Sequence, residues 1–377
     1  MRKVSRKRKI SFKKIFKLLI PLIVFILLII NMNNLIYLYQ SKTTGYNFNT
    51  IKFFHKLDIY NDIKKYKYSD TLNKIINTEC FDKKNAKFYA QINYINNDDY
   101  FKNINEFIKL GYNSNDINLI YDNLDDKDIE LLIKHDYLKD IVNILELSYF
   151  HSDKFSRYIE YNDKFNLNYT DTVTYVNIGL DKDYYTDIVK EENTDDILIL
   201  VNKYHALDSK YIPKDLEKID NKYNRGNNNL MRKAAKEAFE KMCEGALKDN
   251  ITIYSGSAYR SYNYQLNLYN RYVKADGKKI AETYAARAGH SEHQTGLATD
   301  IMNAKLEFIS GSDKEYTWLV NNSYKYGFIL RYPKGKEDIT GYMYEEWHYR
   351  YLGVDTATKV YESGLTYDEY IARQDYK

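Results

Sequence analysis

The amino terminus restricts what this chain can become more than any other feature, because it is basic and then strongly apolar. Residues 1–17 hold nine lysines or arginines and no acid, and thirteen consecutive apolar residues follow, from Leu18 to Ile30. Counted through Tyr39, the segment reaches about twenty residues, the length that a helix needs to span a bilayer. We therefore expect a transmembrane helix within residues 1–40, with its cationic end in the cytoplasm and the body of the chain outside the cell.

Two other interpretations of this segment are open. Thirteen apolar residues match the hydrophobic centre of a signal peptide. No small-x-small cleavage site follows, however, and the bulky residues Asn31, Asn33 and Asn34 stand there instead. A core helix of a cytosolic protein would leave nine flanking cations without a role. We favour an uncleaved signal-anchor over a cleaved signal peptide, which predicts a single-pass protein of the cell membrane whose carboxy-terminal part is extracellular.

The basic terminus conceals the charge of the rest of the chain. The whole chain has a net charge of +4, whereas residues 18–377 carry 47 basic and 52 acidic residues, a net charge of −5. Affinity for nucleic acid depends on clusters of Lys and Arg, so a mildly acidic body is a poor nucleic-acid binder. We expect no nucleic-acid partner, and no pattern in the sequence identifies a protein partner.

Residues 41–195 predict a mainly helical spacer or accessory region. Short amphipathic segments alternate with polar turns, and several begin with an Asn or Asp that can cap a helix. Segments 116–120 and 128–133 resemble each other, which indicates a weak repeat of helical units. Helices are expected at residues 104–110, 115–124, 126–133 and 138–147.

From residue 196 to residue 377 the pattern changes to short strands between capped helices. Such a mixture predicts an α+β domain in which helices pack on a small antiparallel sheet. The longest expected helix carries Cys243 on its apolar face, where a buried free thiol is expected. Helices are expected at residues 231–249, 263–273 and 316–326, and strands at residues 251–254, 297–302, 328–332 and 347–351.

Two short segments carry the residues for chemistry, S-E-H-Q-T-G-L-A-T-D from residue 291 and E-E-W-H-Y-R from residue 345. A catalytic zinc takes three protein ligands, from imidazole and carboxylate groups, and keeps one position open. His293, Asp300 and His348 supply that set. Glu345 lies three residues before His348, close enough in a bent strand to reach the attacking water, as the general base of metal-assisted hydrolysis must.

The pattern S-x-H-x-x-G-x-A-x-D followed by E-x-W-H resembles the VanY-type D-alanyl-D-alanine carboxypeptidases, which are M15 metallopeptidases. The resemblance covers roughly residues 195–370 and includes segments 200–204, 257–261, 326–333 and 339–342. By this resemblance the cofactor is Zn²⁺, the zinc ligands are His293, Asp300 and His348, and Glu345 is the catalytic base. It also implies three substrate-binding residues: an arginine that holds the substrate or the oxyanion, Arg260, and two pocket residues, Gln265 and Ser291.

The same resemblance implies removal of the terminal D-alanine from peptidoglycan stem peptides. D,D-cleavage is favoured, while L,D-cleavage of a tetrapeptide stem is the alternative that the motifs do not separate. A non-catalytic, zinc-containing wall-binding module is the competing interpretation, against which Glu345 and an open zinc position argue. Glu346, Ala288 and Ala258 depart from the family pattern, so we expect altered loop stiffness. His290 is expected to be structural, and Glu292 and Glu346 lack the spacing of the base.

Overall fold

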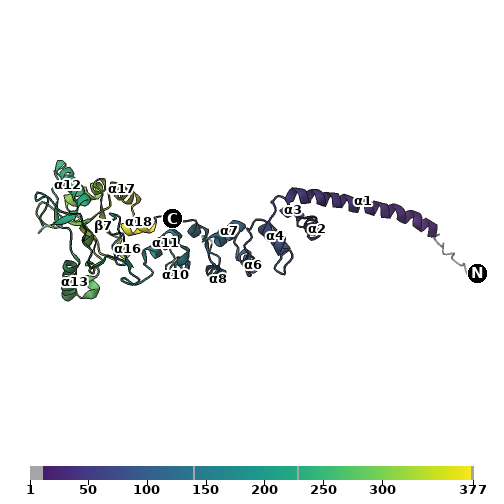
Figure 1. Cartoon of the computed structure of the whole chain (residues 1–377), viewed down its shortest axis with the longest axis horizontal. Helices are drawn as coiled ribbons and strands as arrows, with labels where there is room; N and C mark the ends of the chain where they lie inside the picture. The colour runs from purple at the N-terminus through teal and green to yellow at the C-terminus, as the bar shows by residue number, and fades with distance from the viewer. Residues whose placement is uncertain (1–11, 139–140, 227–228, 375–377) are drawn as a thin grey trace, which may run out of the picture. The chain divides into compact units, whose positions relative to one another are not determined.

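The structure, a computed structural model, describes residues 12–138, 141–226 and 229–374 (Figure 1). Six of the nine amino-terminal cations, in residues 2–9, lie outside the described residues. The chain divides into two compact units, residues 1–145 and 146–377. The expected division into domains 1–40, 41–195 and 196–377 stays a prediction.

The first unit begins with a long apolar helix, α1 (Phe12–Thr44), of 33 residues. Within its stretch from Leu19 to Thr44, a window of 18 residues has a mean hydropathy of 2.4, and none of that window is buried. Within the described ranges it is the one helix that is long and apolar enough to cross a membrane, and a signal sequence would meet the same criteria of length and composition. The helix continues past the expected apolar segment through residues 40–44. It ends where Gly45 adopts the left-handed conformation, with φ at 87°.

Short helices make up the rest of the first unit. Three of the four helices expected at residues 104–147 are present with ends shifted by a few residues, and the fourth is shortened to five residues, next to residues 139–140, which are not described. The helices are α2 (Phe48–Leu57), α3 (Tyr60–Ile63), α4 (Asp70–Ile75), α5 (Ala86–Tyr89), α6 (Tyr100–Leu110), α7 (Ser114–Asn123), α8 (Asp126–Lys134) and α9 (Ile141–Leu145).

One turn occurs twice in this unit, at Gly45–Asn47 and at Gly111–Asn113. In each, a glycine with positive φ ends one helix and an asparagine side chain caps the next. The tyrosine between them is buried, and its hydroxyl accepts a hydrogen bond from a later backbone N–H, that of Ser69 (2.9 Å) in one case and of Leu138 (3.2 Å) in the other. The Gly-Tyr-Asn turn is therefore a repeated structural unit, distinct from the pair of segments in which the sequence indicated a repeat.

The second unit is a mixture of helices and a small sheet, as expected. Its four-stranded sheet has the order β5-β6-β8-β7, and every neighbouring pair is antiparallel. The strands are β5 (Tyr254–Ser257), β6 (Ala298–Met302), β7 (Phe328–Tyr332) and β8 (Glu345–Tyr351). Two short ladders accompany it: β1 (Val189–Lys190) with β2 (His205–Ala206), and β3 (Leu216–Lys218) with β4 (Leu230–Arg232).

The helices of this unit confirm most of the expected elements. The expected helix 316–326 continues as a 3₁₀ turn and ends at Gly327, with φ at 87°. The helices of the second unit are α10 (Phe155–Phe165), α11 (Tyr169–Ile178), α12 (Lys233–Lys248), α13 (Tyr262–Asp276), α14 (Lys278–Ala281), α15 (Lys314–Asn322), α16 (Glu337–Thr340), α17 (Val354–Ser363) and α18 (Tyr367–Ala372).

The core of the second unit forms between α12 and the sheet. Phe239 and Cys243 of α12 are buried in one cluster with Leu297, which precedes β6, and with Ile301 and Phe328 of the strands. Cys243 is a free buried thiol, as expected, and Cys80 is free as well. The strand expected at residues 251–254 was placed too early, because the side chains before Tyr254 are buried in this core while their backbone forms no ladder.

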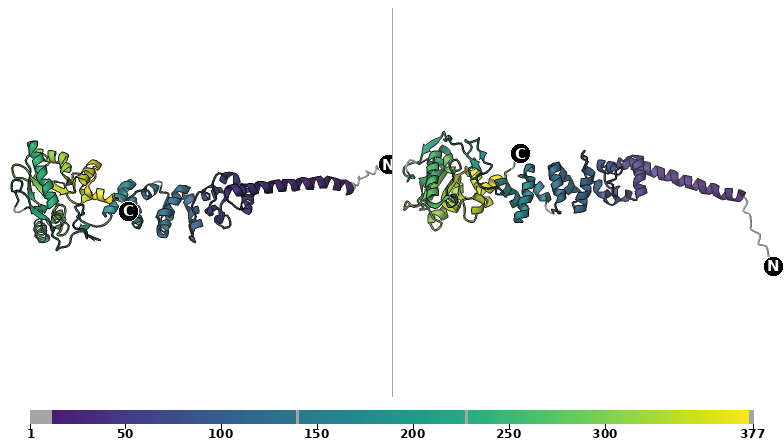
Figure 2. Two further views of the ribbon diagram at one scale, coloured as in Figure 1. Left: turned by 45° about the horizontal axis from the view of Figure 1, so that its top comes forward. Right: turned by 90° about the horizontal axis from the view of Figure 1, so that it is seen from below.

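Helix α11 packs against the carboxy-terminal helix α18, and both views of Figure 2 show the yellow end of the chain beside these teal helices. Arg373 donates to the Thr174 hydroxyl (2.9 Å) and pairs with Asp171 (3.1 Å). Asn177 donates to the carbonyl of Ala372 (3.2 Å). Helix α11, which precedes the expected catalytic domain, is thus joined to the last helix of that domain.

Candidate metal centre

Two neighbouring strands and one short turn carry the predicted metal ligands. Asp300 on β6 is directly opposite His348 on β8 in the antiparallel register. His293 lies in the 3₁₀ turn η3 (Glu292–Thr295), which Gly296 connects to β6 with φ at 69°. A Cβ atom on residue 296 would lie 2.8 Å from a methyl carbon of Leu216, so the tight turn requires glycine.

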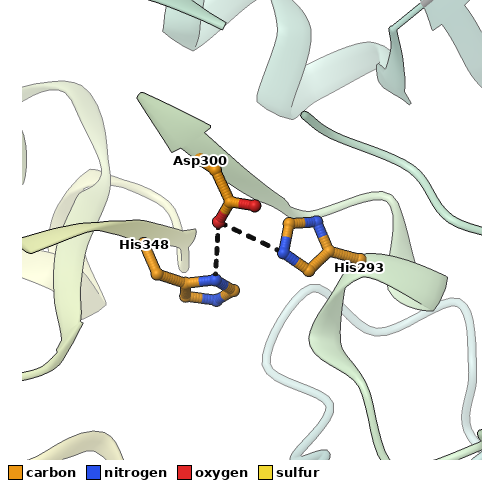
Figure 3. A group of neighbouring side chains, drawn as sticks. All are labelled: His293, Asp300 and His348. Atoms are coloured by element: carbon orange, nitrogen blue, oxygen red, sulfur yellow. Dashed lines mark hydrogen bonds and ion pairs between the residues drawn. The ribbon is translucent and has the colours of Figure 1, made fainter. Parts of the chain in front are cut away.

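The three side chains converge on one point, and Figure 3 shows both imidazole rings directed at the same carboxylate oxygen. His293 Nε2 is 3.3 Å from Asp300 Oδ1, and His348 Nδ1 is 3.1 Å from the same oxygen. One potential ligand atom from each residue lies within 4.8 Å of the others, and all three residues are buried. The structure therefore brings together the three residues that the motif indicated.

Each imidazole has a second partner that orients it. His293 Nδ1 is 2.7 Å from the carbonyl oxygen of Ala258, and a carbonyl can only accept, so this nitrogen donates. His348 Nε2 is 3.2 Å from Glu292 Oε2, which likewise accepts. A lone pair then remains on His293 Nε2. His348 Nδ1 also has a lone pair once the His348 ring has lost its proton and is neutral. Two imidazole nitrogens and one carboxylate oxygen, with their outer nitrogens held by protein oxygens, fit the ligand set of a catalytic zinc.

Burial and neighbouring charges separate the pKa values of the two histidines. Burial, together with the Arg260 guanidinium, lowers the pKa of His293 to about 4. Burial alone would also lower the pKa of His348, but hydrogen bonds to the carboxylates of Asp300 and Glu292 outweigh it and raise this pKa to about 9. At neutral pH and without a metal, His293 is neutral and His348 carries a proton between two carboxylates.

Glu345 begins β8 beside this group. Its Oε2 is 3.9 Å from His348 Nδ1. Burial raises the pKa of Glu345 to about 7, while the neighbouring His348 acts in the opposite direction. Glu346 follows on the strand and points to the other side, where its carboxylate lies near Gly311. Glu345, which has the spacing predicted for the base, is therefore the glutamate that lies next to the triad.

Of the three residues expected in the substrate pocket, Arg260 contacts the triad directly and Gln265 contacts Arg260. The Arg260 guanidinium pairs with the second oxygen of Asp300, Oδ2. It also donates to the Ser257 hydroxyl (3.0 Å) and to Gln265 Oε1 (3.4 Å). Gln265 is buried on α13, whereas Ser291 is buried at the N-cap position of η3.

Known proteins with similar sequences share this part of the chain. The family model described as VanY, D-alanyl-D-alanine carboxypeptidase, matches residues 228–354. YodJ of Bacillus subtilis, which is named as a carboxypeptidase, is 39% identical over 215 residues, or 52% of this chain and 76% of YodJ. The chain belongs to the VanY family of D-alanyl-D-alanine carboxypeptidases. It is therefore a carboxypeptidase of a metal-dependent hydrolase family, and the resemblance inferred from the two motifs is confirmed.

Two further proteins are similar to this part of the chain. The D-alanyl-D-alanine carboxypeptidase of Enterococcus faecalis is 37% identical over 183 residues, which is 46% of this chain and 65% of the enterococcal protein. Among solved structures, the LdcB LD-carboxypeptidase is 38% identical, covers 50% of this chain and 91% of its own, and has a TM-score of 0.47.

One residue in contact with the triad was missed from the sequence, namely Glu292. Its carboxylate is completely buried and accepts hydrogen bonds from Arg331 Nε (2.7 Å), Arg350 Nη1 (2.9 Å) and His348 Nε2. Arg331 in turn pairs with Asp368 of α18 at 2.6 Å. Burial would raise the pKa of Glu292, but the two guanidinium groups hold it well below its ordinary value.

The sequence of β8 contains a signal for these buried ion pairs of Glu292. Arg350 follows His348 at an interval of two, so both side chains leave β8 on the same face. A charged residue on the inner face of a buried strand needs a buried partner of opposite charge. Glu292 itself lacks the spacing of the catalytic base, so the two motifs give it no role. His290, as expected, has a structural contact, between its Nδ1 and the carbonyl of Asn202 (2.8 Å).

Proposed function

We propose that this chain is a zinc-dependent carboxypeptidase that removes the terminal D-alanine from peptidoglycan stem peptides. D,D-cleavage is favoured and L,D-cleavage of a tetrapeptide stem is the alternative. One observation carries the proposal: two imidazole nitrogens and a carboxylate oxygen converge beside the buried carboxylate of Glu345, whose Oε2 lies 3.9 Å from His348 Nδ1. Such a set of groups is what metal-assisted hydrolysis of a peptide bond requires.

His293 Nε2, Asp300 Oδ1 and His348 Nδ1 would hold the zinc ion. When bound, zinc supplies Lewis-acid chemistry, polarising the scissile carbonyl and stabilising the negative charge that develops on its oxygen. The protein prepares this site before any metal arrives, since a carbonyl and a carboxylate fix both imidazoles from behind. Fixed ligands of this kind lose little conformational freedom when the ion binds.

Glu345 is the proposed general base and acid. Its carboxylate removes a proton from the attacking water and then delivers that proton to the leaving amine. Burial raises the pKa of Glu345 to about 7, which makes the carboxylate a better proton acceptor than an exposed glutamate. A group with a pKa near the working pH can both accept and return a proton in one turnover.

Arg260 is the proposed receptor for the free carboxylate that an exopeptidase must recognise. A guanidinium has five N–H donors, and three of them are used by Ser257, Gln265 and Asp300. One N–H remains on each terminal nitrogen, and this pair can bind a carboxylate in two-pronged fashion. Gln265 holds the guanidinium in place, and Ser291 is proposed to line the pocket next to His293.

The place of action follows from α1, which we propose anchors the chain in the cell membrane with the catalytic unit outside. Peptidoglycan lies on that side, so the substrate and the site would share a compartment. Residues 41–195 would then serve as a spacer or accessory region between the bilayer and the metal centre.

The test is release of D-alanine from purified pentapeptide and tetrapeptide stems by the full-length chain. Zinc-dependent release from the pentapeptide is expected. Glu345→Gln should bind zinc normally yet lower kcat by roughly a thousandfold or more, because both proton transfers are lost. Glu346→Gln is the matched control and should be nearly as active as the natural chain. Faster release from the tetrapeptide would favour the L,D alternative, and zinc binding with no release from either peptide would contradict an enzymatic role.

A further inference from the structure

A hollow beside the end of α1 lies outside the catalytic unit. It has a volume of about 410 Å³ and is formed between α1 and α2. Phe48 and His55 of α2 contact Tyr37 of α1, with ring centroids 6.2 and 4.7 Å apart, and His55 Nε2 is 2.7 Å from Gln40 Oε1. The residues that line it are Tyr37, Asn49, Lys52, Phe53, His55 and Lys56.

The position of this hollow along α1 corresponds to the surface of a bilayer. A helix rises 1.5 Å per residue, so a hydrocarbon layer of about 30 Å takes up roughly twenty residues. Counted from Leu19, where the candidate span begins, twenty residues end near Leu38. Tyr37 and Gln40 therefore reach the headgroup level, and the contacts with His55 bring α2 to the same level.

The charge of the hollow is positive and unbalanced. Lys52 and Lys56 are exposed, lie four residues apart on α2, and both face the hollow. No acidic residue occurs in the chain before Asp58, and neither lysine has an ion-pair partner among the described residues. Like charges at this spacing destabilise a helix unless an anion lies between them. An anion in the hollow would relieve that repulsion.

We propose that this hollow binds the phosphate of an anionic phospholipid headgroup, with Lys52 and Lys56 on the phosphate and Tyr37 against the glycerol region. The inference rests on the proposal that α1 crosses a membrane, and it is independent of the carboxypeptidase activity. It makes the α1–α2 pair a lipid-selective anchor, because an apolar helix alone does not distinguish one headgroup from another.

The test uses the full-length chain in bilayer nanodiscs that contain phosphatidylglycerol and phosphatidylcholine. Native mass spectrometry after gentle release should show retained phosphatidylglycerol in preference to phosphatidylcholine. The double variant Lys52→Gln/Lys56→Gln should weaken this preference about thirtyfold, since each lysine near an anionic surface contributes roughly a five- to sixfold change. Lys64→Gln/Lys65→Gln removes two exposed lysines outside the hollow and should leave the preference unchanged.

Three results would overturn the inference. One is equal retention of the two lipids by the natural chain, and another is an equal loss of preference in both double variants. The third is complete displacement of phosphatidylglycerol by millimolar inorganic phosphate, which would make the hollow a site for the free anion. A chain that fails to enter nanodiscs at all would instead contradict the membrane anchor itself.

Discussion

His348 lies between two carboxylates, and the proton it carries determines how the site takes up a metal. Its pKa is raised to about 9, so the ring holds a proton at every pH below that value. Nδ1 can ligate zinc only after this proton leaves. Zinc binding at pH 7 should therefore release about one proton, and zinc affinity should fall by up to tenfold for each pH unit below about 9.

Calorimetry in buffers with different protonation enthalpies measures this release. The measurement is made on the Glu345→Gln variant, because its residue 345 has no carboxyl proton that could add to the proton released by His348. At pH 10 the release should disappear, since His348 is then already neutral. A proton count near zero at pH 7 would show that His348 is neutral in the metal-free protein.

Glu292 orients the same ring from the other side, and its removal should weaken the metal site. Glu292→Gln is expected to lower zinc affinity by about ten- to a hundredfold, the usual effect of losing the outer partner of a metal-binding histidine. Chelator competition measures the affinity, and thermal unfolding of the zinc-free protein shows whether the fold is kept. Glu315→Gln removes a buried carboxylate on α15 and is the control. Equal zinc affinity in a folded Glu292→Gln variant would contradict the orienting role.

Single residues were predictable where chemistry restricts them to a few types. The proposed ligands His293, Asp300 and His348 stand in two compact motifs, and the structure brings their side chains together. Glu292 could not be assigned in the same way. Its role depends on Arg331 and Asp368, which lie 39 and 76 residues further along the chain and reach it only through the fold.

Among the elements, the turn at Gly296 is the one that joins a ligand to the sheet. Gly296→Ala should lower the free energy of unfolding by about 1–3 kcal/mol, because the backbone is left-handed there and the new methyl group would meet Leu216 and Arg232. Gly335→Ala is the matched control, since Gly335 also has positive φ but nothing within 4 Å of its added carbon. Chemical denaturation of both variants separates the two effects. Equal losses would mean that backbone strain alone matters at residue 296.

Elements were predicted well where one pattern dominated. Strands β6 and β7 and helix α12 follow from runs of apolar residues with a clear period. Residues 251–253 show the limit of this argument. Their apolar side chains do enter the core, but burial alone does not determine whether the backbone joins a ladder, and here it does so only from Tyr254.

At the scale of the whole molecule, α1 should determine where the protein is found. The full-length chain is expected in the membrane fraction and should resist extraction by high salt, because about twenty inserted apolar residues are not held by charge. Protease added to cells without walls should remove the catalytic unit while sparing α1. A soluble full-length chain that survives such treatment would contradict both the anchor and the extracellular location.

The predicted boundary at residue 196 separates residues that contact each other in the structure. The residues that join α11 to α18, such as Asp171 and Arg373, are 202 positions apart, and no local pattern connects them. A fragment cut at residue 196 would leave Arg373 without these partners. A fragment that begins at residue 146 keeps them.

The buried charges around Glu292 have a consequence for how this protein can change over generations. Glu292 and Asp368 are matched by Arg331 and Arg350, and none of the four has appreciable contact with water. Loss of any one leaves an uncompensated charge in the interior, at a cost of about 3–5 kcal/mol. The four charged residues should therefore change together during evolution. A lineage that replaces one of them must also replace its partner, or pass through an ancestor that folds poorly.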